Sequence, residues 1–447
     1  MDIGYWQWGV LGGFLILMLV LSPKARDTKT YYQASSNTGK KPGLWLLTSS
    51  LVISWIFAKS ITNAANLGLS YGIMGGLAYG TYYLSFLFAG VVIFRMRTIG
   101  GYRSIHEFLR IKFGKSAVVL FSLLIGFRLL NEVWSNTMVI GSYFGSIGSS
   151  SYYLAILVFT ILTLMYSLRG GLRSSMFTDL IQMILFGFLL LLLLSQIVPQ
   201  IDVKEAFQKD TQWSMAGGLD LALVALVQVF SYPFHDPVLT DRGFISDEKL
   251  TLKAFALATV IGFMSIVLFS LIGVYAKQAG LMGEAAVQVS QSLSVVAMLA
   301  MNFIMITSAS STLDSAFASF SKLINVDLGI LTFSITSGRL IMATMAIVGT
   351  IPIFFSPAIL SATTVSGTMV IGLAPIFLFW KSSVSRYSFL ATVGTGALFG
   401  IGYAAGYYPE GLVLWDTPYG ELLSVNVLGS ISCFVVYFMI RLVHGRS

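Results

Sequence analysis

The stretch W-I-F-A-K-S-I-T-N-A-A-N, from Trp55 to Asn66, decides how this chain is expected to fold. It lies inside an apolar run from Leu44 to Tyr71, yet it carries a lysine, two asparagines, a serine and a threonine. In lipid every backbone polar group must be satisfied internally, so polar side chains and a break in a helix are tolerated only beside protein or a water-filled cavity. The stretch therefore predicts a broken membrane-spanning helix that lines a functional site.

Lys59 is the residue of this stretch that is hardest to place in a membrane. It follows Leu44 by 15 residues, which is about 22 Å along a helix at roughly 1.5 Å per residue. An ionisable group at that depth costs between about 2.5 and more than 10 kcal/mol, depending on how the cost is measured, and marks a functional-site hypothesis. The alternative interpretation is an ion-paired structural lysine.

The composition indicates an all-α, polytopic membrane protein. Hydrophobic residues make up 56% of the 447 residues, and charged residues only 10%. Cys433 is the single cysteine, which excludes a disulfide within the chain and a cysteine-cluster metal site. The three histidines lie far apart in the sequence, so we expect no metal site other than one for an alkali cation. No cofactor is expected. A net charge of +8 would suggest a nucleic-acid partner in a soluble protein, but in a membrane protein the distribution of the charge is more informative than its sum, so no such partner is expected.

The basic residues fix the expected orientation. All but five of the 27 Lys and Arg fall in inner loops; Lys204, Lys209 and Lys277 lie in outer loops, and Lys59 and Arg128 lie within spans. By the positive-inside rule the amino terminus is outside and the carboxyl terminus is cytoplasmic, in the inner (plasma) membrane. The predicted spans number thirteen and begin near Tyr5, Leu44, Ile73, Ala117, Tyr152, Ser174, Gly218, Ala254, Val289, Ser337, Ala358, Tyr387 and Leu422.

A second interrupted segment, S-Y-P-F-H-D-P-V-L-T-D, runs from Ser231 to Asp241. Pro233 and Pro237 each remove a backbone donor there, and they bracket His235 and Asp236. Prolines alone are weak evidence, because membrane helices tolerate them. A pair of interrupted helices in corresponding positions of two halves, however, is typical of a transporter site at an inverted-repeat interface.

Hydroxyl side chains follow one face of the span that contains Thr307 to Ser319. Ser308, Ser311, Thr312 and Ser315 are spaced i, i+3, i+4 and i+7, as on one side of a helix. Hydroxyl and carbonyl oxygens suit a partly dehydrated alkali cation. The alternative is that small hydroxyl residues let helices pack closely. Asp314 flanks this face, and a carboxylate in a packing face is expensive, which favours an ion or proton site.

Further charged residues lie within spans. Asp179 joins Asp314 and Lys59 in a candidate buried charge cluster. Arg128 and Glu132 are spaced i, i+4 and are expected to neutralise each other; the alternative is that Arg128 binds a solute carboxylate. Asn131, Trp134, Ser135 and Asn136 extend that polar patch.

The segment Y-S-L-R-G-G-L-R-S-S-M-F-T-D-L-I-Q, Tyr166 to Gln182, closely resembles the G-G-x-x-x-x-x-x-T-D-x-x-Q pattern of the sodium:solute symporter family, whose members include bacterial proline, galactose and sialic acid carriers. Y-Y-Q-A-S-S from Tyr31 and S-I-H-E-F-L-R-I-K-F-G from Ser104 are also similar to family segments. The resemblance covers essentially the whole chain. It implies a five-plus-five inverted-repeat core with broken core helices one and six. Residues 1–43 would form a first helix and inner loop, 44–200 and 218–381 the two core repeats, and 382–447 two accessory helices.

The resemblance also implies site residues. The shared sodium site would use backbone carbonyls of Trp55, Ala58 and Ser308 and the hydroxyls of Ser311 and Thr312. A second cation site, seen in some members, would fall on Asp179, Ser311, Asp314 and Ser315. Independently of the resemblance, Lys59 belongs with Asp179 and Asp314 to the candidate charge cluster. The candidate solute-binding residues are Thr62, Asn63, Asn66, Asn131, Trp134, Gln228, Tyr232, His235 and Asp236.

Two residues depart from the family pattern. Lys59 directly follows a carbonyl ligand, where the family usually has a small residue, and Asp314 stands where serine is common. One hypothesis is that Lys59 and Asp314 form a buried pair, so that the carrier couples to protons or takes up sodium only when the lysine swings toward an anionic solute. The alternative is that Lys59 points into the solute pocket and binds a carboxylate while sodium binds as usual.

These observations predict a secondary active transporter and not an enzyme. It would import a small polar solute, with a mild preference for a carboxylate, by alternating access around a site at the middle of the membrane. Sodium is the expected coupling ion. The alternatives are a proton-coupled or uncoupled carrier with Lys59 in the ion site, or a solute-sensing membrane protein of transporter-like fold.

Overall fold

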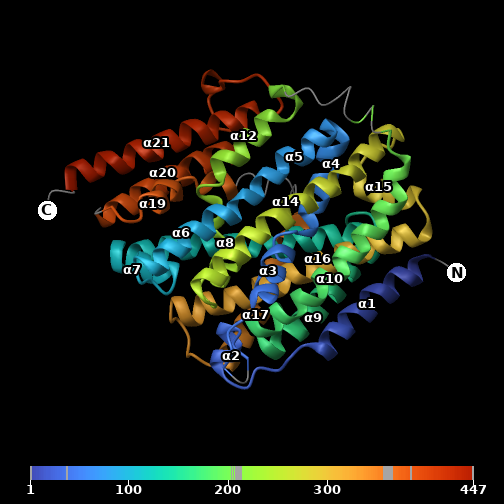
Figure 1. Cartoon of the computed structure of the whole chain (residues 1–447), viewed down its shortest axis with the longest axis horizontal. Coiled ribbons are helices and arrows are strands. Elements are labelled where there is room, and N and C mark those ends of the chain that lie inside the picture. Colours follow the sequence, from blue (N-terminus) through green and yellow to red (C-terminus); the bar gives the residue numbers. More distant parts are fainter. Residues whose placement is uncertain are drawn as a thin grey trace. The chain divides into compact units, whose positions relative to one another are not determined.

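A computed structural model describes residues 3–36, 39–202, 204, 206, 214–355, 366–382 and 385–444. The regular secondary structure of these residues is helical throughout (Figure 1). The chain divides into two compact units. Unit 1 comprises Met1–Leu77, Leu129–Thr211 and Met264–Pro357, and unit 2 comprises Ala78–Arg128, Gln212–Phe263 and Ala358–Ser447. Each unit takes segments from both predicted repeats, so the repeat boundaries at 44–200 and 218–381 stay a prediction.

Among the described residues, nine helices are long and apolar enough to cross a membrane, or ten if the bent pair α3 (Leu44–Ile53) and α4 (Ala58–Tyr71) forms one span. The chain is therefore an integral membrane protein. The nine are α1 (Ile3–Leu21), α5 with η1 and α6 (Ile73–Gly80, Thr81–Tyr83, Leu84–Thr98), α8 (Lys115–Ser142), α9 (Ser150–Gly170), α10 (Leu172–Ile197), α14 (Glu248–Gln278), α16 (Val295–Lys322), α17 (Ile335–Thr350) and α21 (Gly420–His444).

The predicted count of thirteen spans is confirmed only in part. The span predicted from Gly218 corresponds to a short apolar helix, α12 (Leu219–Gln228), and the span predicted from Tyr387 corresponds to α20 (Arg386–Ala404). The span predicted from Ala358 begins within residues 356–365, which lie outside the described residues. The total of thirteen stays a prediction.

In unit 1, α10 packs along α16 and also against α3, while α9 packs against α1 and α16 (Figure 1). The sharp turn between α9 and α10 depends on Gly171, whose φ of +57° suits glycine and whose backbone lies against the carbonyl oxygen of Tyr31. The shorter elements of unit 1 are α2 (Thr28–Gln33), η2 (Val198–Gln200), α15 (Ala285–Ser292), η5 (Leu323–Asp327) and η6 (Ile351–Phe355).

The first helix break lies at the start of the stretch that predicted it. α3 ends at Ile53, α4 begins at Ala58, and the two helices are bent by 60°. Phe57, between them, has extended backbone (φ −60°, ψ 150°), so the helical hydrogen-bond ladder does not continue through it. The rest of the stretch, from Ala58 to Asn66, is helical. The predicted break is confirmed, although it spans fewer residues than the polar sequence suggested.

The second break, in unit 2, is also confirmed. α12 ends at Gln228, a short 3₁₀ helix η4 (Tyr232–His235) follows, and α13 (Pro237–Arg242) begins after Asp236. The Asp236 carboxylate caps α13 by accepting hydrogen bonds from the amides of Val238 and Leu239 at 3.0 and 3.3 Å. Pro233 and Pro237 both lie in first turns, where proline removes no helical hydrogen bond.

In unit 2, α21 packs against both α20 and α12, and α20 runs beside α21 in Figure 1. The segment resembling the family at Ser104 to Gly114 forms α7 (Ile105–Phe113). Ser104 caps it by accepting a hydrogen bond from the Glu107 amide at 2.9 Å. The remaining elements of unit 2 are η3 (Met215–Gly217), α19 (Leu373–Leu378) and η7 (Glu410–Leu412).

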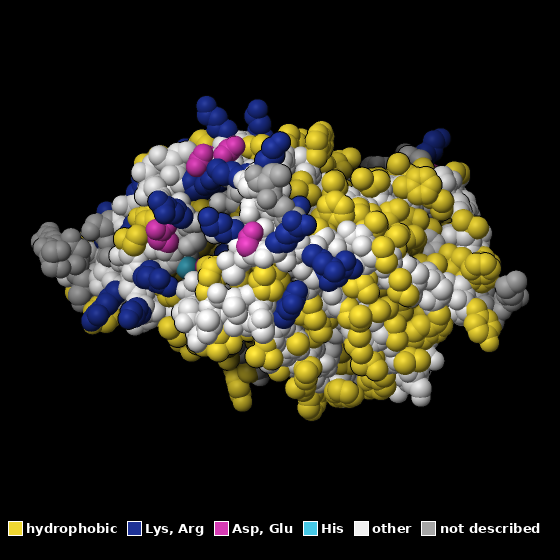
Figure 2. Space-filling view, turned by 90° about the horizontal axis from the view of Figure 1, so that it is seen from below, with side chains coloured by type: hydrophobic (Ala, Val, Ile, Leu, Met, Phe, Trp, Pro, Cys, Tyr) yellow, Lys and Arg dark blue, Asp and Glu magenta, His cyan; other side chains and the backbone are white. Residues whose placement is uncertain are grey.

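The exposed surface of the spanning helices is largely apolar, as a lipid-facing surface requires. Leu123, Leu191 and Ile347, on three different helices, are between 67% and 69% exposed. Figure 2 shows one face on which hydrophobic side chains form broad areas and Lys and Arg side chains gather together.

Candidate cation and solute site

Asp179 is a fully buried carboxylate on α10, in unit 1. It accepts hydrogen bonds from Ser50 and Ser311, each at 2.5 Å, and from Ser54 at 3.4 Å. Ser50 and Ser54 lie at the end of α3, where the first break begins, and Ser311 belongs to the hydroxyl face of α16. Hydrogen bonds to an ionised acceptor are stronger than neutral ones, so these hydroxyls stabilise a charge at Asp179.

Asp314, on α16, is the second fully buried carboxylate of unit 1. It accepts hydrogen bonds from Tyr166 at 2.8 Å, Ser175 at 2.7 Å and Thr178 at 2.9 Å. All three donors come from the Tyr166 to Gln182 segment that resembles the family pattern. The Ser315 hydroxyl lies 3.0 Å from that of Ser54 and 2.8 Å from that of Ser175, and it therefore joins the surroundings of Asp179 and Asp314 into one network.

This network is an oxygen-rich, buried and acidic site. Two carboxylates within a membrane protein are expensive unless their charge is compensated, by hydrogen bonds, a proton or a cation. Carboxylate and hydroxyl oxygens are hard ligands that suit an alkali cation. Within the described residues, no group of three or more His, Cys, Asp or Glu is arranged to hold a metal ion.

The hydroxyl face of α16 lies against the first break. The Ser308 hydroxyl donates a hydrogen bond to the carbonyl of Ile56, and the Thr312 hydroxyl donates to the Ser308 carbonyl at 3.0 Å. Ile56 lies between Trp55 and Ala58, whose carbonyls are the other predicted sodium ligands. The structure thus brings the predicted sodium-binding segments together, while their binding of sodium stays a prediction.

Lys59 is completely buried and lies among side chains of α8. Its ammonium is 2.9 Å from Glu132 Oε1, 3.3 Å from Ser135 Oγ and 3.4 Å from Asn131 Oδ1. The predicted Lys59–Asp314 pair is therefore wrong. Lys59 lies in the first turn of α4 and pairs with Glu132 of α8. The Asp314 carboxylate instead accepts hydrogen bonds from hydroxyl groups.

The candidate solute residues of unit 1 follow two patterns. Asn131 and Trp134 are buried on α8 in the patch that surrounds Lys59, and Thr62 and Asn63 are buried on α4. Asn66 instead holds α15: its amide nitrogen donates to Glu284 at 2.8 Å, and its oxygen accepts from the Ala285 amide at 2.9 Å. Asn66 thus has a structural contact that the sequence did not suggest.

The candidate solute residues of unit 2 gather at the second break. The Arg128 guanidinium lies 3.3 Å from Asp236 and 5.4 Å from the centre of the Tyr232 ring. His235 Nδ1 lies 2.5 Å from the Tyr232 carbonyl. Gln228 accepts from the Tyr82 hydroxyl at 3.0 Å and donates to Asn426 at 2.8 Å.

The predicted neutralisation of Arg128 by Glu132 is not tested, because Arg128 belongs to unit 2 and Glu132 to unit 1. The structure shows an ion pair between Arg128 and Asp236, and another between Lys59 and Glu132.

Several members of the carboxylate network were missed from the sequence. Tyr166, Ser175 and Thr178 lie in the segment that resembles the family pattern, but the pattern does not indicate that they donate hydrogen bonds to Asp314. Ser50 and Ser54 are spaced i, i+4 ahead of the first break, a signal that places both on one face toward Asp179. Tyr82, beside Gln228, carried no sequence signal that we can identify.

Comparisons with known proteins identify the fold. No protein-family model and no curated protein sequence matches this chain. Among solved structures, the substrate-bound, outward-open state of a Na+-coupled sialic acid symporter is similar, with a TM-score of 0.71 and 16% sequence identity over 97% of this chain and 98% of that one.

Two further solved structures are similar at lower TM-scores. Mhp1, a nucleobase-cation-symport-1 family transporter with bromovinylhydantoin bound, has a TM-score of 0.56 and 12% identity over 94% of this chain and 96% of that one. MhsT in complex with L-phenylalanine has a TM-score of 0.54 and 16% identity over 88% of this chain and 98% of that one. The proteins that share this fold are transporters, not enzymes, in agreement with the function class expected from the sequence.

Proposed function

We propose that this protein is a cation-coupled secondary transporter that imports a small polar solute by alternating access, with sodium as the coupling ion. The observation that carries the proposal is the buried network of Asp179 and Asp314 beside the first helix break. A membrane protein gains nothing from two such carboxylates as packing groups, whereas a transporter needs a site whose charge changes with its ligand. The similarity in fold to a Na+-coupled sialic acid symporter supports the choice of sodium.

The network supplies oxygens for two cation positions. Asp179, Ser311, Asp314 and Ser315 would form one, and the carbonyls of Trp55, Ala58 and Ser308 with the hydroxyls of Ser311 and Thr312 would form the other. Each hydroxyl has one donor hydrogen and two acceptor lone pairs, so a serine that donates to Asp179 can rotate and present a lone pair to a cation. Binding would thus exchange hydrogen bonds for coordination with little backbone movement.

In this proposal Lys59 contributes to solute binding and not to the cation site. Its ammonium contacts Asn131 and Glu132, in the patch that contains the candidate solute residues of α8. A solute carboxylate would compete with Glu132 for Lys59, which supports a preference for anionic or zwitterionic solutes. The proposed solute-binding residues are Thr62, Asn63, Asn66, Asn131, Trp134, Gln228, Tyr232, His235 and Asp236.

Proton coupling is the second candidate, and one observation favours it. Ser315 contacts both Asp314, at 3.3 Å, and Ser54, which itself donates to Asp179. Two carboxylates that interact strongly through one hydroxyl network can share a proton. Protons would then replace sodium at the same residues, so the two candidates differ in ion and not in location.

The test compares sodium with potassium and choline at equal concentration, on the purified protein at two pH values. A ligand that binds only the folded state stabilises it by RT ln(1 + [L]/Kd), about 2.7 kcal/mol at a hundredfold excess over Kd. We expect a sodium-specific rise in unfolding temperature and saturable binding of radioactive sodium. Asp179→Asn and Asp314→Asn should each weaken both responses, because each variant removes a carboxylate from one of the two proposed cation positions.

Asp220→Asn is the matched control. Asp220 is also a fully buried carboxylate, but its oxygens accept hydrogen bonds from the amides of Leu221 and Tyr419 in unit 2. This variant should retain the response to sodium even if its stability changes. A response to pH without a response to sodium would favour proton coupling, and loss of the sodium response in Asp220→Asn alone would contradict the assigned site.

A further inference from the structure

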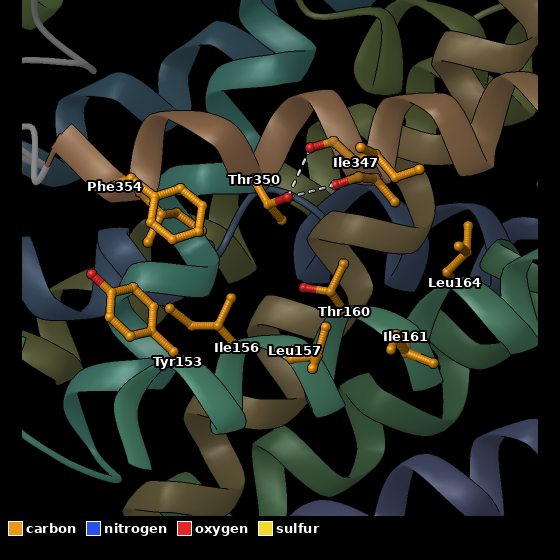
Figure 3. A pocket seen from close by; sticks show the side chains of 11 residues that line it. Tyr153, Ile156, Leu157, Thr160, Ile161, Leu164, Ile347, Thr350 and Phe354 are labelled. Carbon is orange, nitrogen blue, oxygen red and sulfur yellow. Dashed lines mark hydrogen bonds between the residues drawn. The ribbon is translucent and has the colours of Figure 1, made fainter. Parts of the chain in front are cut away.

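A groove with a cavity volume of about 330 Å³ lies between α9 and the α17–η6 segment, within unit 1 (Figure 3). This volume is at the lower end of the range of about 300–1,000 Å³ typical of small-molecule sites. None of the residues assigned to the carboxylate network or to solute binding lines the groove. Its walls are Tyr153, Ile156, Leu157, Thr160, Ile161, Leu164, Ala346, Ile347, Thr350, Ile353 and Phe354.

The groove opens toward the side of the protein that faces lipid. Ile156, Ala346 and Ile353 are buried at its floor, with exposed fractions of 5%, 4% and 3%. Leu157 and Phe354 are 56% and 70% exposed at its margin. Because α9 and α17 both qualify as membrane spans, a molecule that enters the groove comes from the bilayer.

One polar group in the groove has no partner. The Thr160 side chain is only 6% exposed, and its hydroxyl makes no hydrogen bond to the described part of the chain. Figure 3 shows this hydroxyl directed into the space between the two walls. A helical threonine normally bonds a carbonyl three or four residues earlier, as Thr350 on the opposite wall does with Ile347 at 2.8 Å and Ala346 at 3.1 Å. A buried hydroxyl without a partner is costly, and an oxygen of a bound molecule would remove that cost.

The depth of Thr160 restricts what that molecule is. Thr160 follows the first residue of α9, Ser150, by ten residues, which is about 15 Å along the helix. The hydrocarbon core of a bilayer is about 30 Å thick, so Thr160 lies near its middle. Lipid head groups and ester groups lie at the interface, and an acyl chain at this depth offers no oxygen. The occupant that satisfies Thr160 is therefore not an ordinary phospholipid.

We propose that this groove binds a small, mostly apolar molecule that dissolves in the bilayer and carries one hydrogen-bonding oxygen, such as a medium-chain alcohol, a ketone or a phenol. The apolar walls would hold its hydrocarbon part, and Thr160 would bond its oxygen. The bound molecule contacts α9 and α17 together, so it links two helices that both pack on α16, the helix that carries Asp314.

The test uses the whole protein in lipid nanodiscs and an octanol derivative with a photoactivatable diazirine. Labelled residues are mapped by mass spectrometry, and the label is competed with unlabelled octanol or with octane. We expect saturable labelling of groove residues on α9 and α17, with octanol competing at least fivefold more effectively than octane. That ratio corresponds to the net worth of about one hydrogen bond.

Two variants and a matched control locate the site. Thr160→Val keeps the shape of the side chain but removes the hydroxyl, and should weaken octanol competition about fivefold. Ala346→Phe fills the floor and should abolish saturable labelling. Thr163→Val is the control, because Thr163 is on the same helix and its buried hydroxyl likewise has no partner in the described structure, but it does not line the groove. It should leave binding unchanged.

Several results would overturn the proposal. They are labelling spread evenly over the apolar surface, octane competing as well as octanol, equal effects of Thr160→Val and Thr163→Val, or a co-purified phospholipid chain that octanol does not displace. If Ala346→Phe fails to fold, the comparison of octanol with octane on the unmodified protein and on Thr160→Val still decides the question.

Discussion

Lys59 and Glu132 form an ion pair from which water is excluded, with side-chain exposures of 0% and 4%. Removing two charges from water is costly, and their attraction repays that cost only when the geometry is good and the remaining donors are satisfied. Here Asn131 and Ser135 accept further hydrogen bonds from the ammonium, and Asn136 donates to Glu132 at 2.9 Å. We therefore expect the net contribution of the pair to the free energy of unfolding to be small, whereas removing one partner would leave an uncompensated buried charge and cost more.

Lys59→Met and Glu132→Gln should each lower the free energy of unfolding, by about 3–5 kcal/mol for removal of one partner of a buried pair. The double variant should lose clearly less than the sum of the two, because no uncompensated charge is left. The measurement is thermal unfolding in detergent. Lys322→Met serves as the control, since its pair with Asp327 is longer, at 3.4 Å, and the lysine side chain is partly exposed; it should cost about 1 kcal/mol or less. Additive losses in the double variant would contradict the coupling.

At this scale the sequence identified the charged residues but not all of their partners. Lys59, Asp179 and Asp314 were recognised because ionisable groups in apolar spans are rare and costly. The pairing of Lys59 with Asp314 was wrong, because partner choice depends on how each helix is rotated about its axis. In helices as apolar as α10 and α16, the hydropathy pattern does not show which side of the helix faces its neighbours.

Helices α4 and α14 approach each other closely within unit 1, at glycines. A Cβ added at Gly273 of α14 would meet the carbonyl oxygen of Ala65, and one added at Gly68 would meet the carbonyl oxygen of Ser270. Small residues allow such approach in membranes, where helix association depends on van der Waals packing and not on a hydrophobic driving force. The contact holds α4, the second half of the first broken helix, in place.

Gly273→Ala should therefore destabilise the protein, by about 1–3 kcal/mol, the usual cost of overpacking. Gly187→Ala, on α10, is the control, because nothing lies within 4 Å of the Cβ that it would introduce. That variant should be neutral or gain up to about 1 kcal/mol from better helix propensity. Unfolding temperatures of the two variants measure the difference, and equal temperatures would show that α4 and α14 separate without cost.

The helices themselves could be predicted well from the sequence, and their breaks also. Apolar runs mark spans because lipid admits few polar residues, and the breaks at Phe57 and Asp236 follow from polar residues and prolines in such runs. The contacts of Asn66 with α15 could not be predicted, because they depend on a packing between segments more than 200 residues apart.

At the scale of the whole molecule, the orientation depends on the span count. The positive-inside pattern predicts that the loop after α1 is cytoplasmic and that the loop between α20 and α21 is outside. An odd number of spans must then separate Lys40 from Tyr407. The segments that the structure supports least as spans, from Gly218, Ala358 and Tyr387, all lie between these two residues, so one miscounted span would place Lys40 and Tyr407 on the same side.

Cysteine labelling tests this prediction. Cys433 is buried, and Cys433→Ser provides a background without cysteine into which Lys40→Cys or Tyr407→Cys is introduced. Both positions are exposed, Tyr407 at 83%. A maleimide that cannot cross membranes should label Tyr407→Cys but not Lys40→Cys in right-side-out vesicles, and the reverse in inside-out vesicles. Labelling of Lys40→Cys and Tyr407→Cys from the same side would mean that an even number of spans separates the two positions. One of the segments from Gly218, Ala358 or Tyr387 would then not cross the membrane, and the predicted repeats would lose their basis.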